Sequence, residues 1–108
     1  MTNYQLDTFQ VIADPSRRQI LTMLTQENMS INALSAQFDI SRPAVSKHIK
    51  ILETAGFISI QEVGRERHCT LKKDGFDDLQ EWINFFDNFW ASKLKNLEIL
   101  LDKNQSKN

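Results

Sequence analysis

The residues of this chain best suited to chemistry are cations and a hydroxyl group on one side of a short segment, residues 41–56. At 100° per residue, as in a helix, Pro43, Lys47 and Lys50 fall on one side with Ser46 beside them. Cations and a hydroxyl near a helix start, where free amides and the helix dipole attract anions, suit phosphate binding. A solvated surface with a few lysines would show the same pattern, so the neighbouring elements have to decide.

Both ends of this segment carry helix signals. Ser41 can cap the amides of the first turn, Pro43 lies where its missing N–H costs nothing, and Gly56 can take the left-handed conformation that ends a helix. The apolar side consists of Val45, Ile49 and Leu52. We therefore predict a helix with an inner face in the core and a basic outer face.

A shorter helix is predicted just before it. Ser30 can cap a helix that runs through Ile31, Leu34 and Phe38, and only residues 39–41 link the two helices. Two capped helices joined by a short turn, the second with a basic outer face, form a helix-turn-helix pattern. We place this pattern at about residues 31–55.

A β-hairpin is predicted after the basic helix. The first and last parts of residues 57–71 have the composition of strands, and residues 64–66 between them can form a tight turn. Beside a helix-turn-helix, such a hairpin is a wing. Arg65 at its tip and Arg67 just beyond could contact the DNA backbone or minor groove, although an arginine at a hairpin tip often serves only solubility.

Two helices are expected before the helix-turn-helix. The first covers residues 4–13, and the second is capped by Asp14, opened by Pro15 and continues to about Thr25. The apolar residues available for burial are Leu6, Phe9 and Val11 or Ile12 in the first helix, and Ile20, Leu21 and Leu24 in the second.

Arg17 and Arg18 lie in the first turn of the second predicted helix, where the helix dipole favours acids. We interpret this pair as packing within the fold or pairing with an acid, and a phosphate contact is the alternative.

A long amphipathic helix is predicted at about residues 75–102, with Asp74 as its candidate cap. At 1.5 Å per residue it spans about 40 Å, longer than a domain of this size needs to cover its own core. Its apolar stripe therefore requires a partner. The simplest is the same helix of a second copy, in a two-fold dimer whose basic helices face successive major grooves about 34 Å apart. The residues expected in this interface are Phe86, Phe89, Trp90, Leu94, Leu97 and Leu101.

Three stretches together resemble a known family. They are Asp14-Pro15-Ser16-Arg17-Arg18-Gln19-Ile20-Leu21, Ser41-Arg42-Pro43-Ala44-Val45-Ser46-Lys47-His48 and Leu52-Glu53-Thr54-Ala55-Gly56-Phe57-Ile58. In this order they closely resemble the ArsR/SmtB family of bacterial winged-helix repressors, over nearly the whole chain. The resemblance implies a winged helix-turn-helix fold in a single domain, residues 1–108. This fold is mainly α with a small β-hairpin and a long C-terminal dimerisation helix.

The last helix is similar to that of one branch of this family. The similarity lies in the spacing of its aromatic and leucine residues, from Leu79 through Trp82, Phe89 and Trp90 to Leu101. Members of this branch are metal-independent repressors that are often encoded beside START-like small-molecule-binding proteins. The resemblance leaves the effector of this chain unknown.

Metal sensors of the resembled family use cysteine pairs at the start of the helix before the recognition helix, or Asp/His and His/Glu sets along the last helix. Here residues 30–34 contain no cysteine and the last helix contains no histidine, so we expect no metal and no cofactor. His68 and Cys69 lie on opposite faces of a strand and cannot easily chelate one ion. We interpret Cys69 as a half-buried strand residue, with a redox-sensing thiol as the alternative. For His48, a structural role and a phosphate contact both remain open.

Charge is unevenly distributed along the 108 residues, although the net charge is only −1. Residues 41–73 hold seven basic and three acidic residues, a net charge of +4, and the remainder carries −5. A basic middle is expected if one face of the protein meets phosphate. The chain has no membrane-length apolar run, no secretion signal in residues 1–10 and a single cysteine. We therefore expect a cytoplasmic protein without a membrane partner.

The chain shows no glycine-rich phosphate loop and no nucleophile with a nearby base, so we do not expect an enzyme. We interpret it as a sequence-specific double-stranded DNA-binding regulator, a homodimeric repressor of an inverted-repeat operator. Base edges are expected to be contacted by Arg42, Ser46 and Lys47, and phosphates by Ser41, Lys50, Arg65 and Arg67, with Pro43 on the same face. The alternative is a winged-helix protein-interaction module without specific DNA binding.

Overall fold

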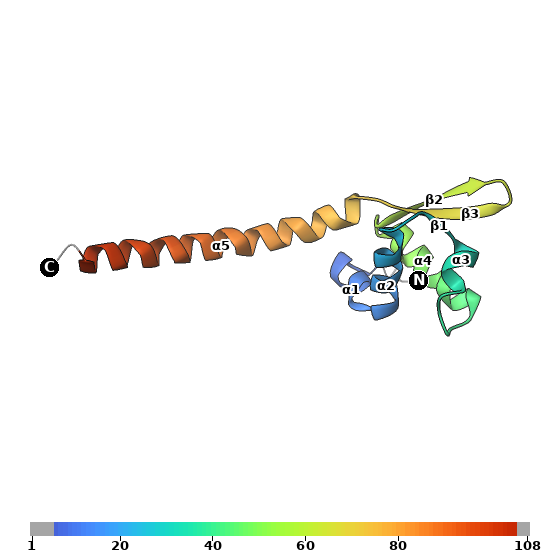
Figure 1. Cartoon of the computed structure of the whole chain (residues 1–108), viewed down its shortest axis with the longest axis horizontal. Coiled ribbons are helices and arrows are strands. Elements are labelled where there is room, and N and C mark those ends of the chain that lie inside the picture. The colour runs from blue at the N-terminus through green and yellow to red at the C-terminus, as the bar shows by residue number, and fades with distance from the viewer. Residues whose placement is uncertain (1–5, 106–108) are drawn as a thin grey trace, which may run out of the picture. The chain divides into compact units, whose positions relative to one another are not determined.

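The computed structural model describes residues 6–105 and is mainly helical, with one small antiparallel sheet (Figure 1). Its elements are α1 (Thr8–Ala13), α2 (Pro15–Leu24), β1 (Met29–Ser30), α3 (Ile31–Ser35), α4 (Arg42–Thr54), β2 (Ile58–Val63), β3 (Glu66–Leu71) and α5 (Asp74–Gln105). The chain divides into two compact units between Asp78 and Leu79, so the second unit is the greater part of α5. The predicted fold class, mainly α with a β-hairpin and a long last helix, is confirmed.

The two helices of the helix-turn-helix begin where their caps predict. The Ser30 hydroxyl accepts a hydrogen bond from the Ala33 N–H at 3.0 Å, and the Ser41 hydroxyl accepts one from the Ala44 N–H at 3.3 Å. Gly56 has a φ of 82°, the left-handed conformation expected just past the end of α4. The predicted limits of the basic helix are therefore confirmed.

Three predicted limits of the other helices are wrong. The helix expected to run through Phe38 ends at Ser35, and Phe38 lies partly exposed in the turn beyond it. Residues 4 and 5 lie outside the described residues, but a continuous helix over residues 4–13 is excluded because Asp7 caps α1. Its carboxylate accepts the Gln10 N–H at 2.8 Å, and the Gln10 side chain accepts the Asp7 N–H in return. Asp74 is the first residue of α5 rather than its cap.

The predicted wing forms as an antiparallel hairpin. Ile58 pairs with Leu71 at its base and Val63 pairs with Glu66 at its tip, which leaves residues 64 and 65 as the turn. The hairpin belongs to a three-stranded sheet of order β1-β3-β2.

Strand β1 is not predicted from the sequence, because two residues are too few to show the alternation of a strand. It pairs with β3 through Met29 opposite Cys69 and Ser30 opposite His68. Since β1 runs directly into α3, this pairing fixes the start of α3 to the middle of β3.

The core of the first unit is formed by apolar side chains from α1 to α4 and from the sheet. The buried residues are Val11, Ile20, Leu21, Leu24, Ile31, Leu34, Val45, Ile49, Leu52, Phe57, Ile58 and Cys69. Phe9, which the sequence offers for burial, is instead 41% exposed. Because Val45, Ile49 and Leu52 face this core, the opposite side of α4 faces solvent.

The start of α5 packs closely on the core at Gly75. A Cβ atom at this position would lie 2.7–2.8 Å from ring atoms of Phe57, closer than real Cβ contacts. The ring of Phe76 packs edge-on against Phe57, with 4.9 Å between the ring centroids. Glycine at position 75 therefore allows α5 to begin against the most deeply buried aromatic side chain of the unit.

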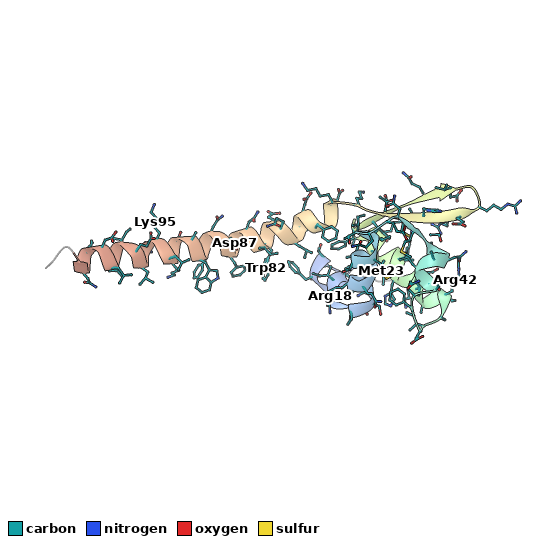
Figure 2. All side chains as sticks on the ribbon, in the orientation of Figure 1. Arg18, Met23, Arg42, Trp82, Asp87 and Lys95 are labelled. Atoms are coloured by element: carbon teal, nitrogen blue, oxygen red, sulfur yellow. The ribbon has the colours of Figure 1, made fainter. Side chains whose placement is uncertain are left out.

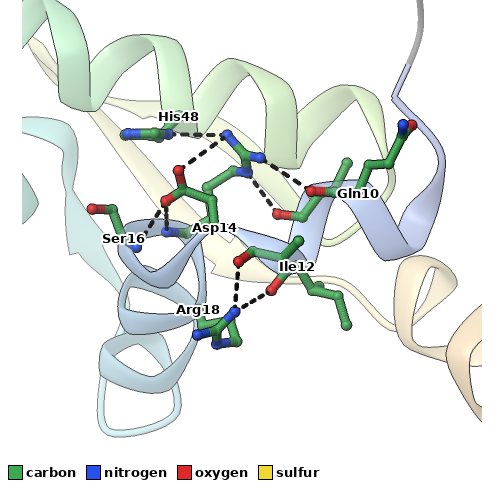
Figure 3. A network of polar contacts seen from close by, with 9 residues as sticks. Gln10, Ile12, Asp14, Ser16, Arg18 and His48 are labelled. Carbon is green, nitrogen blue, oxygen red and sulfur yellow. Dashed lines mark hydrogen bonds and ion pairs between the residues drawn. The ribbon is translucent and has the colours of Figure 1, made fainter.

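Arg17 and Arg18 bond the carbonyl groups that end α1 (Figure 3). A helix leaves its last four carbonyls without partners. Here they belong to Gln10, Val11, Ile12 and Ala13. Arg17 donates to the first two, at 3.2 and 2.6 Å, and Arg18 donates to the last two, at 2.8 Å each. The interpretation of this pair as part of the packing is confirmed.

Arg17 also connects α2 with α4. Its Nη1 lies 3.2 Å from Nδ1 of His48, and because a guanidinium only donates, Nδ1 is the acceptor. The Asp14 carboxylate accepts the N–H groups of Ser16 and Arg17, at 2.8 and 3.2 Å. Burial raises the pKa of Asp14, but these hydrogen bonds outweigh it and leave the pKa below its usual value. Through its bond with Arg17, His48 therefore makes a structural contact between α4 and α2.

Candidate nucleic-acid interface

The outer face of α4 presents the predicted contact residues to solvent. Ser46 is partly exposed, and the other members of the set on this helix and its cap are exposed. These are Ser41, Arg42, Pro43, Lys47 and Lys50. The structure thus brings onto one surface the residues that helical spacing places together, and the buried inner face of α4 determines which way this surface points.

The two lysines of this face have weak or no ties to the rest of the protein. Lys50 Nζ lies 3.1 Å from a Glu53 carboxylate oxygen, but the lysine side chain is 74% exposed, and such surface pairs contribute little. Among the described residues, Lys47 has no side-chain hydrogen bond or ion pair. Both ammonium groups are therefore available to an external anion.

A groove of about 650 Å³ separates this face from the start of α1. It is lined by Leu6 just before α1, Val11 of α1 and Ile51 of α4, together with Lys47 and Lys50. The aliphatic stems of the lysines can lie along this apolar surface while their ammonium groups remain in water.

The wing arginines lie near the start of α4. Arg65 and Arg67 are both exposed, and with Arg42 they line a recess of about 130 Å³ at which α3, α4 and the wing meet. One acid, Glu66, lines the same recess, and its carboxylate lies 3.1 Å from Nε2 of His68. The recess is therefore a concave surface with a surplus of positive charge.

Asn32 is a contact that the sequence does not indicate. Its side-chain oxygen accepts a hydrogen bond from Arg42 Nε at 2.7 Å, across the turn that joins α3 to α4. Nothing in residue spacing identifies a partner ten positions away on a different helix. The bond becomes visible only once the angle between the two helices is known.

Comparison with known proteins agrees with this arrangement. Residues 14–59 match the family model described as bacterial regulatory protein, arsR family. The chain is 32% identical to the HTH-type transcriptional regulator Rv2034 of Mycobacterium tuberculosis over 94 residues, 87% of this chain and 85% of that protein. It is 33% identical to the transcriptional repressor SdpR of Bacillus subtilis over 82 residues, 76% of this chain and 91% of that protein. The chain belongs to the ArsR family.

Solved structures of ArsR-family proteins share the fold. The crystal structure of an ArsR family transcriptional regulator, RHA00566, has a TM-score of 0.72 and 34% identity, covering 79% of this chain and 88% of that one. A possible transcriptional regulator for arsenical resistance has a TM-score of 0.67 and 36% identity, covering 85% and 93%. This ArsR-family protein is therefore a transcriptional regulator with a winged helix-turn-helix DNA-binding fold.

The single cysteine of this ArsR-family chain is inert by position. Cys69 is 0% exposed, deeper than the half-buried residue expected from the sequence, and burial raises the pKa of its thiol to about 11. A reactive thiol needs a lowered pKa, so the structure disfavours a redox sensor here. Within residues 6–105, no three His, Cys, Asp or Glu side chains are placed to hold a metal ion.

The apolar stripe of α5 is exposed in the single chain. Its predicted interface residues have exposed fractions from 40% at Phe86 to 63% at Leu94. Aromatic rings pack edge-on along the helix, Trp82 on Phe86 at 4.8 Å and Phe89 on Trp90 at 5.1 Å between centroids. Figure 2 shows Trp82 and Lys95 projecting from different sides of α5. No helix in the part of the chain that the structure describes is long and apolar enough to cross a membrane.

Proposed function

We propose that this ArsR-family regulator binds a specific double-stranded DNA sequence as a homodimer and represses transcription there. The observation that carries the proposal is that Arg42 of α4 lines one recess with the wing arginines, while Lys47 and Lys50 are exposed on the outer face of the same helix. No structural role explains why these three cations, Lys47, Lys50 and Arg42, are exposed together. Contacts with DNA phosphates and base edges would explain it. Repression is the activity given in the name of the relative SdpR.

The roles within the interface follow from position. Arg42, Ser46 and Lys47 lie near the start of α4, the end of a recognition helix that reaches base edges in the major groove. Ser41, Lys50, Arg65 and Arg67 contact phosphates and fix the register of the protein, with Pro43 on the same face. Because phosphate contacts carry no sequence information, specificity depends on the first group.

The homodimer is proposed from α5. A contiguous exposed stripe of large apolar residues is unusual on a monomeric protein. The interface residues are Phe86, Phe89, Trp90, Leu94, Leu97 and Leu101. In a two-fold dimer through this stripe, each copy of the chain contributes a single domain. The symmetry of the dimer then requires an inverted-repeat operator.

A protein-interaction module is the second candidate, favoured only by the exposed aromatic residues of α5. It does not explain why the cations of α4 and of the wing are exposed.

We further propose that the protein acts in the cytoplasm, where bacterial promoters are, and is not an enzyme, as its relatives are regulators.

A charge-reversal experiment tests DNA binding without knowledge of the operator. The double variant Lys47→Glu/Lys50→Glu and the matched control Lys72→Glu/Lys73→Glu change the net charge equally. Binding to a fluorescent random-sequence duplex at low salt should fall at least tenfold for the first variant and much less for the second. Equal losses would mean that the chain attracts DNA by overall charge alone, and unchanged binding of both would favour the interaction module.

A further inference from the structure

Arg42 is the only arginine on the outer face of α4, and its side chain is held in place before any ligand binds. The Nε–H of its guanidinium donates to the Asn32 side-chain oxygen at 2.7 Å. This distance lies at the short end of N–H···O hydrogen bonds, as expected when the donor is charged. The contact joins the first turn of α3 to the first turn of α4.

Both ends of this contact rest on firmly anchored backbone. On the α3 side, Ile31 is 6% exposed and Leu34 is fully buried, and β1 pairs the preceding residues with β3. On the α4 side, Ser41 caps the helix, and Val45 is fully buried one turn after Arg42. The bond therefore joins two exposed side chains whose backbones are both held in the fold, which restricts where the guanidinium can lie.

The geometry of the guanidinium decides what remains available. An arginine has five N–H donors in a planar fork, one on Nε and two on each terminal nitrogen. With Nε engaged by Asn32, the edge formed by the two terminal nitrogens is left for a ligand. This edge presents two parallel N–H groups, the arrangement that pairs with O6 and N7 of guanine in the major groove.

Asn32 holds Arg42 without reducing the positive charge of the surface. Arg65 and Arg67 line the same recess as Arg42. Without the bond to Asn32, charge repulsion would favour conformations of Arg42 that point away from these two arginines. An aspartate would also hold the guanidinium, but it would cancel one charge and repel DNA phosphates. A neutral amide oxygen fixes the orientation and keeps the attraction.

We infer that Asn32 is a positioning residue that presents the end of Arg42 to one guanine in each operator half-site. This inference deepens the proposed function and depends on it. Asn32 itself touches no base. By holding the Arg42 side chain in one orientation, it reduces the conformational entropy that this side chain loses on binding. Only binding to the preferred base requires that orientation.

The test compares the base preferences of four variants, measured by competition between the preferred duplex and duplexes substituted at each position. Asn32→Ala should lower the preference for guanine at one base pair per half-site by about two- to tenfold, the range expected when one long side chain must be ordered on binding. Affinity for random duplex and its salt dependence should stay unchanged, because no charge is lost. The control Gln37→Ala removes an exposed side-chain amide from the link between α3 and α4, and it should change neither the guanine preference nor the affinity for random duplex.

Asn32→Asp keeps the acceptor oxygen and provides the rescue. It should retain the guanine preference while weakening all sequences alike, since it adds a negative charge near DNA. Arg42→Ala should remove the preference altogether, by about 5- to 150-fold, the worth of a bidentate pair with a base.

The outcomes separate the inference from the proposed function. Uniform weakening of all sequences by Asn32→Ala would show that the recess serves phosphate, and the inference would be wrong. Loss of preference in Arg42→Ala but not in Asn32→Ala would show that Arg42 reads the base without help. If the unaltered protein prefers no sequence, the proposed function fails, and the inference fails with it.

Discussion

Arg17 shows how a single residue can look like a nucleic-acid contact and serve the fold instead. It is basic, and it lies in the first turn of α2, three residues after the cap Asp14. The structure buries it and uses its donors on α1 carbonyls and on His48. Its charge is therefore not available to DNA, whereas the charges of Lys47 and Lys50 are.

Replacing these arginines tests that assignment. Arg17→Ala should lower the free energy of unfolding by about 2–3 kcal/mol, because it leaves buried acceptors without donors, and Arg18→Ala should cost about 1 kcal/mol at its exposed site. Urea unfolding followed by circular dichroism measures both. A lowered salt dependence of DNA binding in Arg17→Ala, with unchanged stability, would make this residue a phosphate contact after all.

Lys50 is assigned to phosphate, so its removal should act equally on all sequences. Lys50→Ala should weaken specific and random duplex by the same factor and reduce the slope of log affinity against log salt by about 1 per protomer. Lys73→Ala, a lysine outside the proposed interface, is the matched control. A change of base preference in Lys50→Ala would contradict the division between phosphate and base contacts.

Cys69 should be protected by its burial. With a pKa of about 11, only about one thiol in a thousand is ionised at pH 8, so iodoacetamide should react ~100-fold more slowly with the folded than with the urea-unfolded protein. The unfolded thiol ionises first as pH rises, so this group makes stability fall between pH ~9 and 11. Fast alkylation of the folded protein, with loss of DNA binding, would restore the redox-sensor alternative.

At the scale of elements, the sequence predicts best what local chemistry determines. Ser30, Ser41 and Asp14 cap helices within a few residues of themselves, and all three caps form. What depends on distant partners is not predictable in this way. The pairing of β1 with β3, the early end of α3 before Phe38 and the bond from Arg42 to Asn32 all require the packing of separate elements. Which residues share the outer face of α4 depends only on helical spacing and burial, so the sequence suffices to predict it, and their contact with DNA stays a prediction.

The exposed stripe makes α5 the element whose partner can be tested on its own. Trp90→Asp and Leu97→Asp should each place a charge in the proposed dimer interface and give monomers, because an unpaired buried carboxylate is costly. Lys95→Asp should stay dimeric, because helical spacing of about 100° per residue places Lys95 away from Trp90 and Leu97; Figure 2 shows it on a different side of α5 from Trp82. Sedimentation equilibrium measures the mass. Dimers in all three variants would place the interface outside α5.

For the whole molecule, charge and symmetry act together. The net charge is −1, yet Arg42 lines one recess with Arg65 and Arg67, and Lys47 and Lys50 are exposed on the same helix as Arg42, so the proposed attraction to DNA is local. A monomer with this face would hold DNA weakly, whereas a two-fold dimer links two half-site contacts and gains affinity from their connection. Dimerisation through α5 and specific DNA binding through α4 are therefore one claim.

Selection of bound duplexes from a random pool, repeated at two salt concentrations, tests this claim most directly. We predict enrichment of an inverted repeat with half-sites about one helical turn apart, retained at the higher salt concentration because base contacts add to phosphate contacts. Enrichment of a single unrepeated site would contradict the symmetric dimer. Retention of duplex only at low salt, with no common sequence, would contradict specific DNA recognition.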